Sequence, residues 1–263
     1  MHSSRLRTQS RTARNLTDST RRLFASGPSD FSRESLFSAA NRDRCVKLLK
    51  RTESARPRSL LSKSADVSHP YAVLVPMLLV NDKPSILFTL RSAHLPKHAG
   101  EVSFPGGNIQ DGESLLDAAL RETHEEVGLD TELVHVWGQL TPSLTSRLDR
   151  TVTPFVGLID ESITPIDLIP NDAEVELVFT RTIEQLCRPE NIGHTQFRTA
   201  SAIGAKRQQK LVPHFQAYSL PVFLGRPYRI WGLTAVILHQ LLVILCGDLY
   251  KPTVKTVQLE KSK

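Results

Sequence analysis

The stretch Gly107–Leu129 decides the fold and reads GNIQDGESLLDAALRETHEEVGL. Ser114, with Asp117 three residues later, is typical of a helix start, because the serine side chain can cap free backbone N–H groups of the first turn. Gly128 suits the left-handed conformation that follows many helix ends. We therefore expect an α-helix over residues 115–127.

The helical period of 3.6 residues gives this segment two distinct faces. An apolar stripe that would face a core consists of Leu116, Ala119, Leu120, Thr123 and Val127. Beside it, on a face that we expect to be exposed, Glu122, Glu125 and Glu126 fall within an arc of about 100°. Their i+3 and i+4 spacing places the three carboxylates together.

Carboxylates at this spacing repel one another, and two of them lie close to the negative end of the helix. A bound cation relieves both penalties, and ligands that are all oxygen select hard ions such as Mg²⁺ or Mn²⁺. The alternative is an ordinary solvated acidic face, in which Arg121 pairs with Glu125 four residues later. The three glutamates alone leave both interpretations open.

The wider pattern resembles the nudix box, G-x5-E-x7-R-E-U-x-E-E-x-G-U, in which U is aliphatic. The matching positions are Gly107, Glu113, Arg121, Glu122, Glu125, Glu126, Gly128 and Leu129. The one departure is Thr123 at an aliphatic position. The resemblance implies an α/β fold, the nudix α/β/α sandwich with a mixed sheet. It also implies metal-dependent hydrolysis of a nucleoside diphosphate linked to another moiety.

The same resemblance assigns roles to the acidic side chains. Glu122 and Glu126 would be the core metal ligands for Mg²⁺ or Mn²⁺, and Glu125 a further ligand or a general base. Glu174, in a later loop, is the second candidate base, since a base must reach the attacking water. Arg121 completes the set of catalytic candidates.

The loop that precedes the helix resembles the extra motif of coenzyme A diphosphatases, roughly L-L-T-x-R-S-x3-R-x3-G-x3-F-P-G-G. The matching positions are Thr89, Arg91, Ser92, Gly100, Phe104, Pro105, Gly106 and Gly107. Pro96 stands where that family has arginine, and Lys97 is next to it. The resemblance implies that the substrate is coenzyme A or an acyl-coenzyme A, cleaved to 3′,5′-ADP and (acyl-)4′-phosphopantetheine.

Residues of this loop are the candidates for substrate binding: Arg91, Ser92, Lys97, His98, Phe104, Gly106 and Gly107. The cationic side chains can donate hydrogen bonds to phosphates, and the glycines let the backbone approach a diphosphate closely. Two other functions stay open. One is the same chemistry on NADH or a dinucleotide, and the other is a nudix-shaped binding module without turnover.

The remaining chain predicts a mixed α/β arrangement over about residues 70–250. Strands are expected at 71–80, 85–90, 134–140, 151–159 and 175–179, with a turn at 81–84 between the first two. The apolar run 233–245 predicts a core helix, because about 13 residues are too few to span a membrane. The segments Val136–Leu140, Leu220–Phe223 and Ile230–Ala235 also resemble animal mitochondrial members of the coenzyme A diphosphatases.

The charge of the chain is unevenly distributed. The net charge of +6 belongs to the first 65 residues, which hold 15 Lys+Arg and 5 Asp+Glu, so the rest is mildly acidic and no nucleic-acid partner is expected. Residues 1–29 are Arg-rich, Ser-rich and almost free of acids, which is typical of a transit peptide for the mitochondrial matrix. A disordered basic tail and plastid import are the alternatives.

Residues 30–69 then read as a basic linker in which Cys45–Leu49 seeds a short helix that packs on the domain. Residues 70–250 form the nudix domain and 251–263 a tail. Three widely spaced cysteines form no zinc or disulfide pattern. The sequence does not define the oligomeric state.

Overall fold

The computed structural model describes residues 27–53, 70–144, 151–198 and 217–252. The main sheet contains β1 (Tyr71–Val80), β2 (Lys83–Arg91), β3 (Val102–Ser103), β4 (Gly106–Asn108), β5 (Val134–Gln139), β6 (Ser143–Leu144), β7 (Thr151–Ile159) and β8 (Val175–Thr182). A second, two-stranded sheet contains β9 (Ile192–Arg198) and β10 (Ala217–Phe223).

The α-helices are α2 (Arg33–Leu36), α3 (Ala39–Glu53), α4 (Leu115–Val127), α5 (Ile183–Cys187) and α6 (Gly232–Cys246). Short 3-10 helices occupy Thr131–Leu133, Pro165–Asp167, Pro189–Asn191 and Gly247–Leu249.

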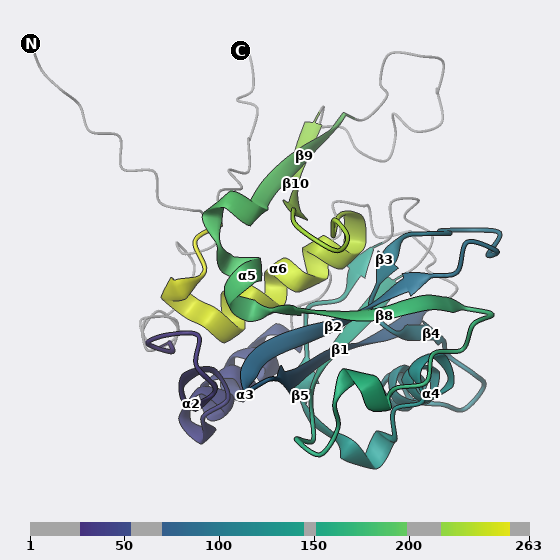
Figure 1. Ribbon diagram of the computed structural model, residues 1–263, viewed down its shortest axis with the longest axis horizontal. Helices are drawn as coiled ribbons and strands as arrows, with labels where there is room; N and C mark the ends of the chain where they lie inside the picture. Colours follow the sequence, from purple (N-terminus) through teal and green to yellow (C-terminus); the bar gives the residue numbers. More distant parts are fainter. Residues whose placement is uncertain (1–26, 54–69, 145–150, 199–216, 253–263) are drawn as a thin grey trace, which may run out of the picture.

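The main sheet is mixed. Its strand order is β3-β2-β1-β7-β5, while β4 pairs with β1, β6 with β7 and β8 with β2. The central pair β1 and β7 is parallel, whereas the other pairs are antiparallel. The long connection between β1 and β7 contains α4, as a parallel pair requires. Figure 1 shows α4 on one side of the sheet and α3 with α6 on the other, which confirms the expected α/β/α sandwich.

The structure around β1 explains why residues 71–80 form a continuous apolar run in the sequence. Ala72 and Leu74 pack against the α4 side, while Val73 and Val75 belong to the larger core on the α3 and α6 side. A strand covered on both faces has no polar alternation. The predicted hairpin is confirmed, but its turn is shorter than expected: Asn81 and Asp82, both with positive φ, form it, and Lys83 and Pro84 already pair with β1.

Helix α6 agrees with the expectation of a core helix. Leu238 and Leu242 are fully buried in the larger core. Among the described helices, the run Gly232–Leu249 alone meets the length and composition of a membrane span, and 44% of it is buried inside the molecule. The buried part of this run belongs to the larger core, together with residues of α3 and β1, although the helical run is longer than the 13 residues expected.

The segment expected as a linker contributes more structure than its composition predicted. The helix foreseen at Cys45–Leu49 extends over all of α3, and Leu36, Leu48 and Leu49 lie in the larger core. Its basic residues obscured the helical pattern: most of them are exposed, but Arg44 is buried and donates to the Ile244 and Leu245 carbonyls of α6. The expected leader lies outside the described residues apart from its last three positions, as does most of the tail.

Candidate active site

Helix α4 begins and ends where its sequence predicts. The Ser114 side chain accepts a hydrogen bond from the Asp117 N–H at 3.1 Å and donates one to the Asp117 carboxylate at 2.6 Å. Gly128 follows the helix with φ 70°, and its N–H donates to the His124 carbonyl at 2.8 Å. Both ends are therefore fixed, which holds the acidic residues of the last turns in a defined position.

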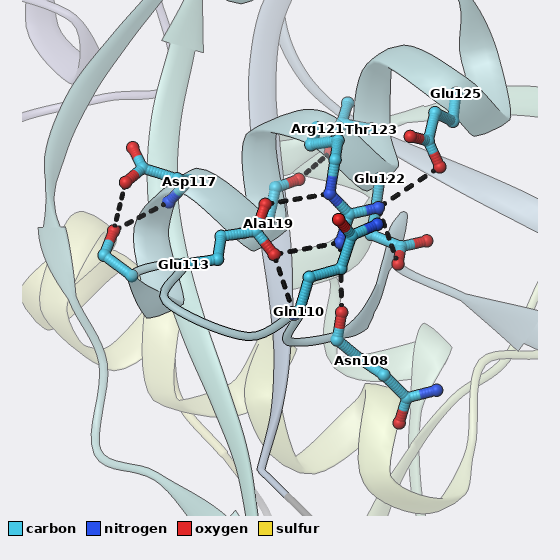
Figure 2. Close-up of polar contacts among 10 residues, drawn as sticks. Asn108, Gln110, Glu113, Asp117, Ala119, Arg121, Glu122, Thr123 and Glu125 are labelled. Carbon is cyan, nitrogen blue, oxygen red and sulfur yellow. Dashed lines mark hydrogen bonds and ion pairs between the residues drawn. The ribbon is translucent and has the colours of Figure 1, made fainter.

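Arg121 connects three glutamates, as Figure 2 shows. Its Nε donates to Glu113 at 2.8 Å, and its Nη1 lies 3.1 Å from Glu122 and 3.2 Å from Glu125. Nη2 donates to the Asn108 carbonyl and to Glu113, both at 3.1 Å. The pairing with Glu125 that the sequence allowed is present, but it belongs to a larger network that ties the incoming loop to the helix.

Glu126 is buried, with 4% of its surface exposed, so the expectation that all three glutamates lie on an exposed face is wrong for this residue. Gly106 N–H approaches its carboxylate at 3.4 Å. Burial raises the pKa of Glu126 to about 8, the charge of Arg91 opposes this rise, and the charges of Glu174 and Glu122 add to it. The pairing of β4 with β1 covers this side of the helix, which the helical period alone could not foresee.

The two glycines of β4 let the glutamates approach the backbone. A Cβ on Gly107 would lie 2.0 Å from the Glu122 carboxyl carbon, so this carboxylate rests where any other side chain would begin. Gly106 has φ 153°, and a Cβ there would lie 2.2 Å from the Ala72 carbonyl. Burial raises the pKa of Glu122, and the hydrogen bond from Arg121 opposes that rise.

The loop after β7 brings Glu174 to the same place. Asn171 N–H donates to the Glu126 carbonyl, and Ser92 N–H donates to the Glu174 carbonyl, both at 2.9 Å. Val175 then pairs with Arg91 in the sheet. Because the charge of Glu174 raises the pKa of both Glu122 and Glu126, its carboxylate lies near theirs. Two segments about eighty residues apart in sequence therefore meet at the end of α4.

Arg91, at the end of β2, lies near Glu126. Its charge lowers the pKa of Glu126, and its Nε is buried without a hydrogen-bond partner among the residues that the structure describes. A buried guanidinium nitrogen without an acceptor is costly unless a ligand satisfies it. The sequence-based assignment of Arg91 to substrate binding fits this position.

The other candidates from the loop differ in exposure. Lys97 and His98 are exposed at the loop tip, where His98 pairs with Glu101 at 3.0 Å. Ser92 and Phe104 are buried, and the Phe104 ring stacks on Phe88 with centroids 5.2 Å apart. These two side chains shape the loop from the core side.

Tyr71 is a member of the site that the sequence reasoning missed. Its hydroxyl donates to the Gly106 carbonyl at 2.5 Å. Burial raises its pKa to about 12, and the charges of Glu126, Glu122 and Glu174 add to that rise while Arg91 opposes it. The only signal was the position of Tyr71 at the start of β1, opposite Asn108 in the pairing with β4.

The chemistry of the donors fits a hard divalent cation. Among the described residues, no three His, Cys, Asp or Glu side chains converge on one point that could hold an ion. Glu125 is half-exposed and bound to Arg121. Glu122 and Glu126, however, are carboxylates withdrawn from water, and the cation that would offset their burial is one that prefers oxygen. These two residues are the ligands that best suit a metal here.

The model of the NUDIX domain family matches residues 68–200. The "Mitochondrial coenzyme A diphosphatase NUDT8" of Mus musculus is 39% identical over 229 residues, which are 85% of this chain and 97% of that protein. The Homo sapiens protein of the same name is 41% identical over 186 residues, 69% of this chain and 71% of that one. A Nudix hydrolase structure from M. smegmatis, RenU, has a TM-score of 0.37 and 22% identity, covering 45% of this chain and 73% of that one. With half of the chain matched by the domain model and relatives this similar, the chain belongs to the Nudix hydrolase family.

Proposed function

We propose that this protein uses Mg²⁺ or Mn²⁺ to hydrolyse the diphosphate linkage of coenzyme A or its thioesters. The products would be 3′,5′-ADP and (acyl-)4′-phosphopantetheine. One observation carries the proposal: two glycines of the loop Arg91–Gly107 lie against the glutamates of α4, and Arg91, whose Nε is buried without a partner among the described residues, is close enough to lower the pKa of Glu126. Its similarity to proteins named mitochondrial coenzyme A diphosphatases supports the choice of substrate.

Glu122 and Glu126 would hold the cation, with Glu125 as a further ligand once it leaves Arg121. A bound ion neutralises charge on the bridging phosphates and makes a carboxylate site attractive to a polyanion. Arg91 would donate its free Nε–H to a phosphate oxygen. Gly106 and Gly107 would let the diphosphate approach the backbone without a side chain in between.

Glu174 is the base that the geometry favours. It lies close enough to Glu122 and Glu126 to raise the pKa of both, and no ion pair engages its carboxylate among the described residues. Glu125, the other candidate, accepts a hydrogen bond from Arg121 at 3.2 Å. Glu174 would take a proton from the attacking water as the new P–O bond forms and the P–O bond to the leaving phosphate breaks.

Arg121 would act by positioning and would not touch the substrate. Four of its contacts go to carboxylates and one to the Asn108 carbonyl, so its donors are engaged by the protein itself. Its removal would free Glu113 and Glu122 together and loosen the loop that contains Gly107.

The deciding experiment is incubation of the purified protein with coenzyme A and Mg²⁺ or Mn²⁺, followed by chromatographic separation of products. We expect 3′,5′-ADP and 4′-phosphopantetheine in equal amounts and none with Glu126→Gln. Cleavage of NADH or a dinucleotide with coenzyme A untouched would assign the same chemistry to another substrate. Binding of coenzyme A without any product would favour a binding module.

The relatives named as mitochondrial support a mitochondrial location, and the composition of residues 1–29 supports entry into the matrix. A fluorescent fusion of residues 1–40 tests this. We expect import into mitochondria, and replacement of Arg5, Arg7, Arg11 and Arg14 by glutamine should prevent it. A diffuse cytosolic signal from the unaltered fusion would refute the assignment of residues 1–29 as a mitochondrial leader.

A further inference from the structure

Arg181 is a buried cation far from the glutamates of α4. It lies on β8 opposite Ile86, and 3% of its surface is exposed. Its Nε and Nη1 are buried and have no hydrogen-bond partner among the described residues. Burial alone lowers its pKa, and no acidic group opposes that change. A guanidinium with two buried nitrogens that have no partner is unfavourable, so its presence needs a physical reason.

A short loop closes over this guanidinium. Phe223 and Ile230 exchange two backbone hydrogen bonds, at 2.8 and 2.9 Å, which fix both ends of the segment 224–229. Gly225 in this loop has φ 108°, and a Cβ there would lie 2.8 Å from Arg181 Nη2. Only glycine therefore lets the backbone come this close. The loop adds Arg226 and Arg229 and has no acidic residue.

Edge strand β8 connects the region of Glu174 with Arg181, and exposed apolar groups lie along it. Val175 begins the strand beside Glu174, and Arg181 lies six residues further, which is roughly 20 Å of extended chain. Leu177 and Tyr228 are 39% and 36% exposed along this path, and the Tyr228 ring packs on Phe179 with centroids 5.5 Å apart. Exposed apolar side chains therefore lie along β8 between Glu174 and the guanidinium of Arg181.

We propose that Arg181 and the loop 224–229 form a binding site for an oxyanion, a carboxylate or a phosphate, separate from the glutamates of α4. The planar guanidinium presents parallel N–H donors that match the two oxygens of such a group. The cationic loop over it adds no competing acceptor from an acidic side chain. The anion would accept from Nε or Nη1 together with Nη2, which is the common member of both parallel N–H pairs, and would reduce the penalty of the buried charge.

The length of β8 between Val175 and Arg181 suggests which anion belongs there, and this step rests on the proposed function. From its phosphate to its sulfur, the pantetheine arm of coenzyme A has about twelve bonds, or ~15 Å when extended. A four-carbon dicarboxylic acyl group adds about 5 Å, which brings its terminal carboxylate to ~20 Å from the diphosphate. A neutral acyl group of equal length reaches the same point without a charge. The site would therefore select thioesters of dicarboxylic acids.

Thermal unfolding of the metal-loaded protein, with and without inorganic phosphate or succinate, tests the site without catalysis. We expect both anions to raise Tm of the wild type and of the control Arg188→Met, which removes an exposed arginine of the α5 C-terminus. Arg181→Met should lose this rise while being at least as stable as wild type without anion, since an apolar group replaces an unpaired buried charge. Arg181→Lys should keep the charge and a weaker rise. A less stable Arg181→Met protein with an unchanged anion effect would overturn the proposal.

Kinetics with succinyl-coenzyme A and butyryl-coenzyme A identify the source of the anion. If the substrate supplies it, wild type should favour the succinyl thioester in kcat/KM, and Arg181→Met should lose about tenfold or more on that substrate alone. Equal losses on both, with the anion-induced Tm rise retained by wild type, would support a site for free phosphate instead. If neither Tm nor selectivity depends on Arg181, there is no such site. If wild type cleaves neither coenzyme A nor either thioester, the proposed function fails while the unfolding experiment still tests Arg181.

Discussion

Replacing Glu126 by glutamine in the metal-free protein should increase its stability at neutral pH. Burial raises the pKa of this carboxyl from an ordinary 4.5 to about 8, so the folded state binds a proton that the unfolded state has already released at pH 7. The 2.5 pH units between the ordinary value and pH 7 correspond to about 3 kcal/mol. Glutamine keeps the shape and has no charge to lose.

The direction in which stability changes with pH follows from proton binding. Between pH 4.5 and about 8 the folded state holds more protons than the unfolded state, so the stability of the wild type falls as pH rises through this window. Glu126→Gln lacks this dependence. The two proteins should therefore unfold with similar free energies at pH 4 and differ by about 3 kcal/mol at pH 7, with Glu126→Gln the more stable.

Urea unfolding at pH 4, 5, 6 and 7 in the presence of a chelator measures this difference directly. Glu125→Gln is the matched control, because its carboxylate is half-exposed and its surface ion pair contributes little. With Mn²⁺ added, the order should reverse, since only the wild type gains from the metal. Turnover of Glu126→Gln should fall on the order of a hundredfold or more. A pH-independent difference between the two proteins, or a gain of equal size in Glu125→Gln, would refute the reasoning.

Three further outcomes are expected. Gly107→Ala should fold normally but lose most activity, because the added Cβ meets only the flexible carboxylate of Glu122 and must displace it. Gly106→Ala should instead lose several kcal/mol of unfolding free energy in urea, because its Cβ meets rigid backbone at an unfavourable φ. Equal stability of the two variants would contradict this. Glu174→Gln should lower kcat roughly 10²- to 10⁴-fold with KM little changed, and a larger loss in Glu125→Gln would move the base to Glu125.

Local sequence signals were sufficient for the helix that carries the chemistry. The caps of α4 at Ser114 and Gly128 are interactions within a few residues, and so the sequence predicts both ends without knowledge of the fold. The same holds for the hairpin of β1 and β2, whose turn at Asn81 is read from adjacent residues. These elements also place Arg91 and Gly107 at the start and end of one loop.

Features that depend on distant segments could not be predicted in this way. The burial of Glu126 comes from β4 pairing with β1, and the position of Glu174 comes from a loop attached to the end of α4. Strands β9 and β10 were not predicted because they pair across a separation of nearly twenty residues and include Pro221, which is unusual within a strand. For the same reason, the sequence did not predict that Arg181 is buried with two nitrogens that have no partner among the described residues.

The burial of Glu126 links the stability of this protein to the ion it would hold. When no cation is present, the raised pKa of Glu126 destabilises the folded state by about 3 kcal/mol at pH 7. An ion at a concentration a thousand times its Kd stabilises a folded protein by about 4 kcal/mol, which is enough to offset that penalty. Because the carboxyl must lose its proton to bind the ion, the apparent affinity should rise with pH up to about 8. A solvated glutamate in its place would bind the ion with no such pH dependence above its ordinary pKa. The slope of metal affinity against pH between pH 6 and 8 therefore measures how far burial, rather than the number of carboxylates, determines the metal affinity of the site.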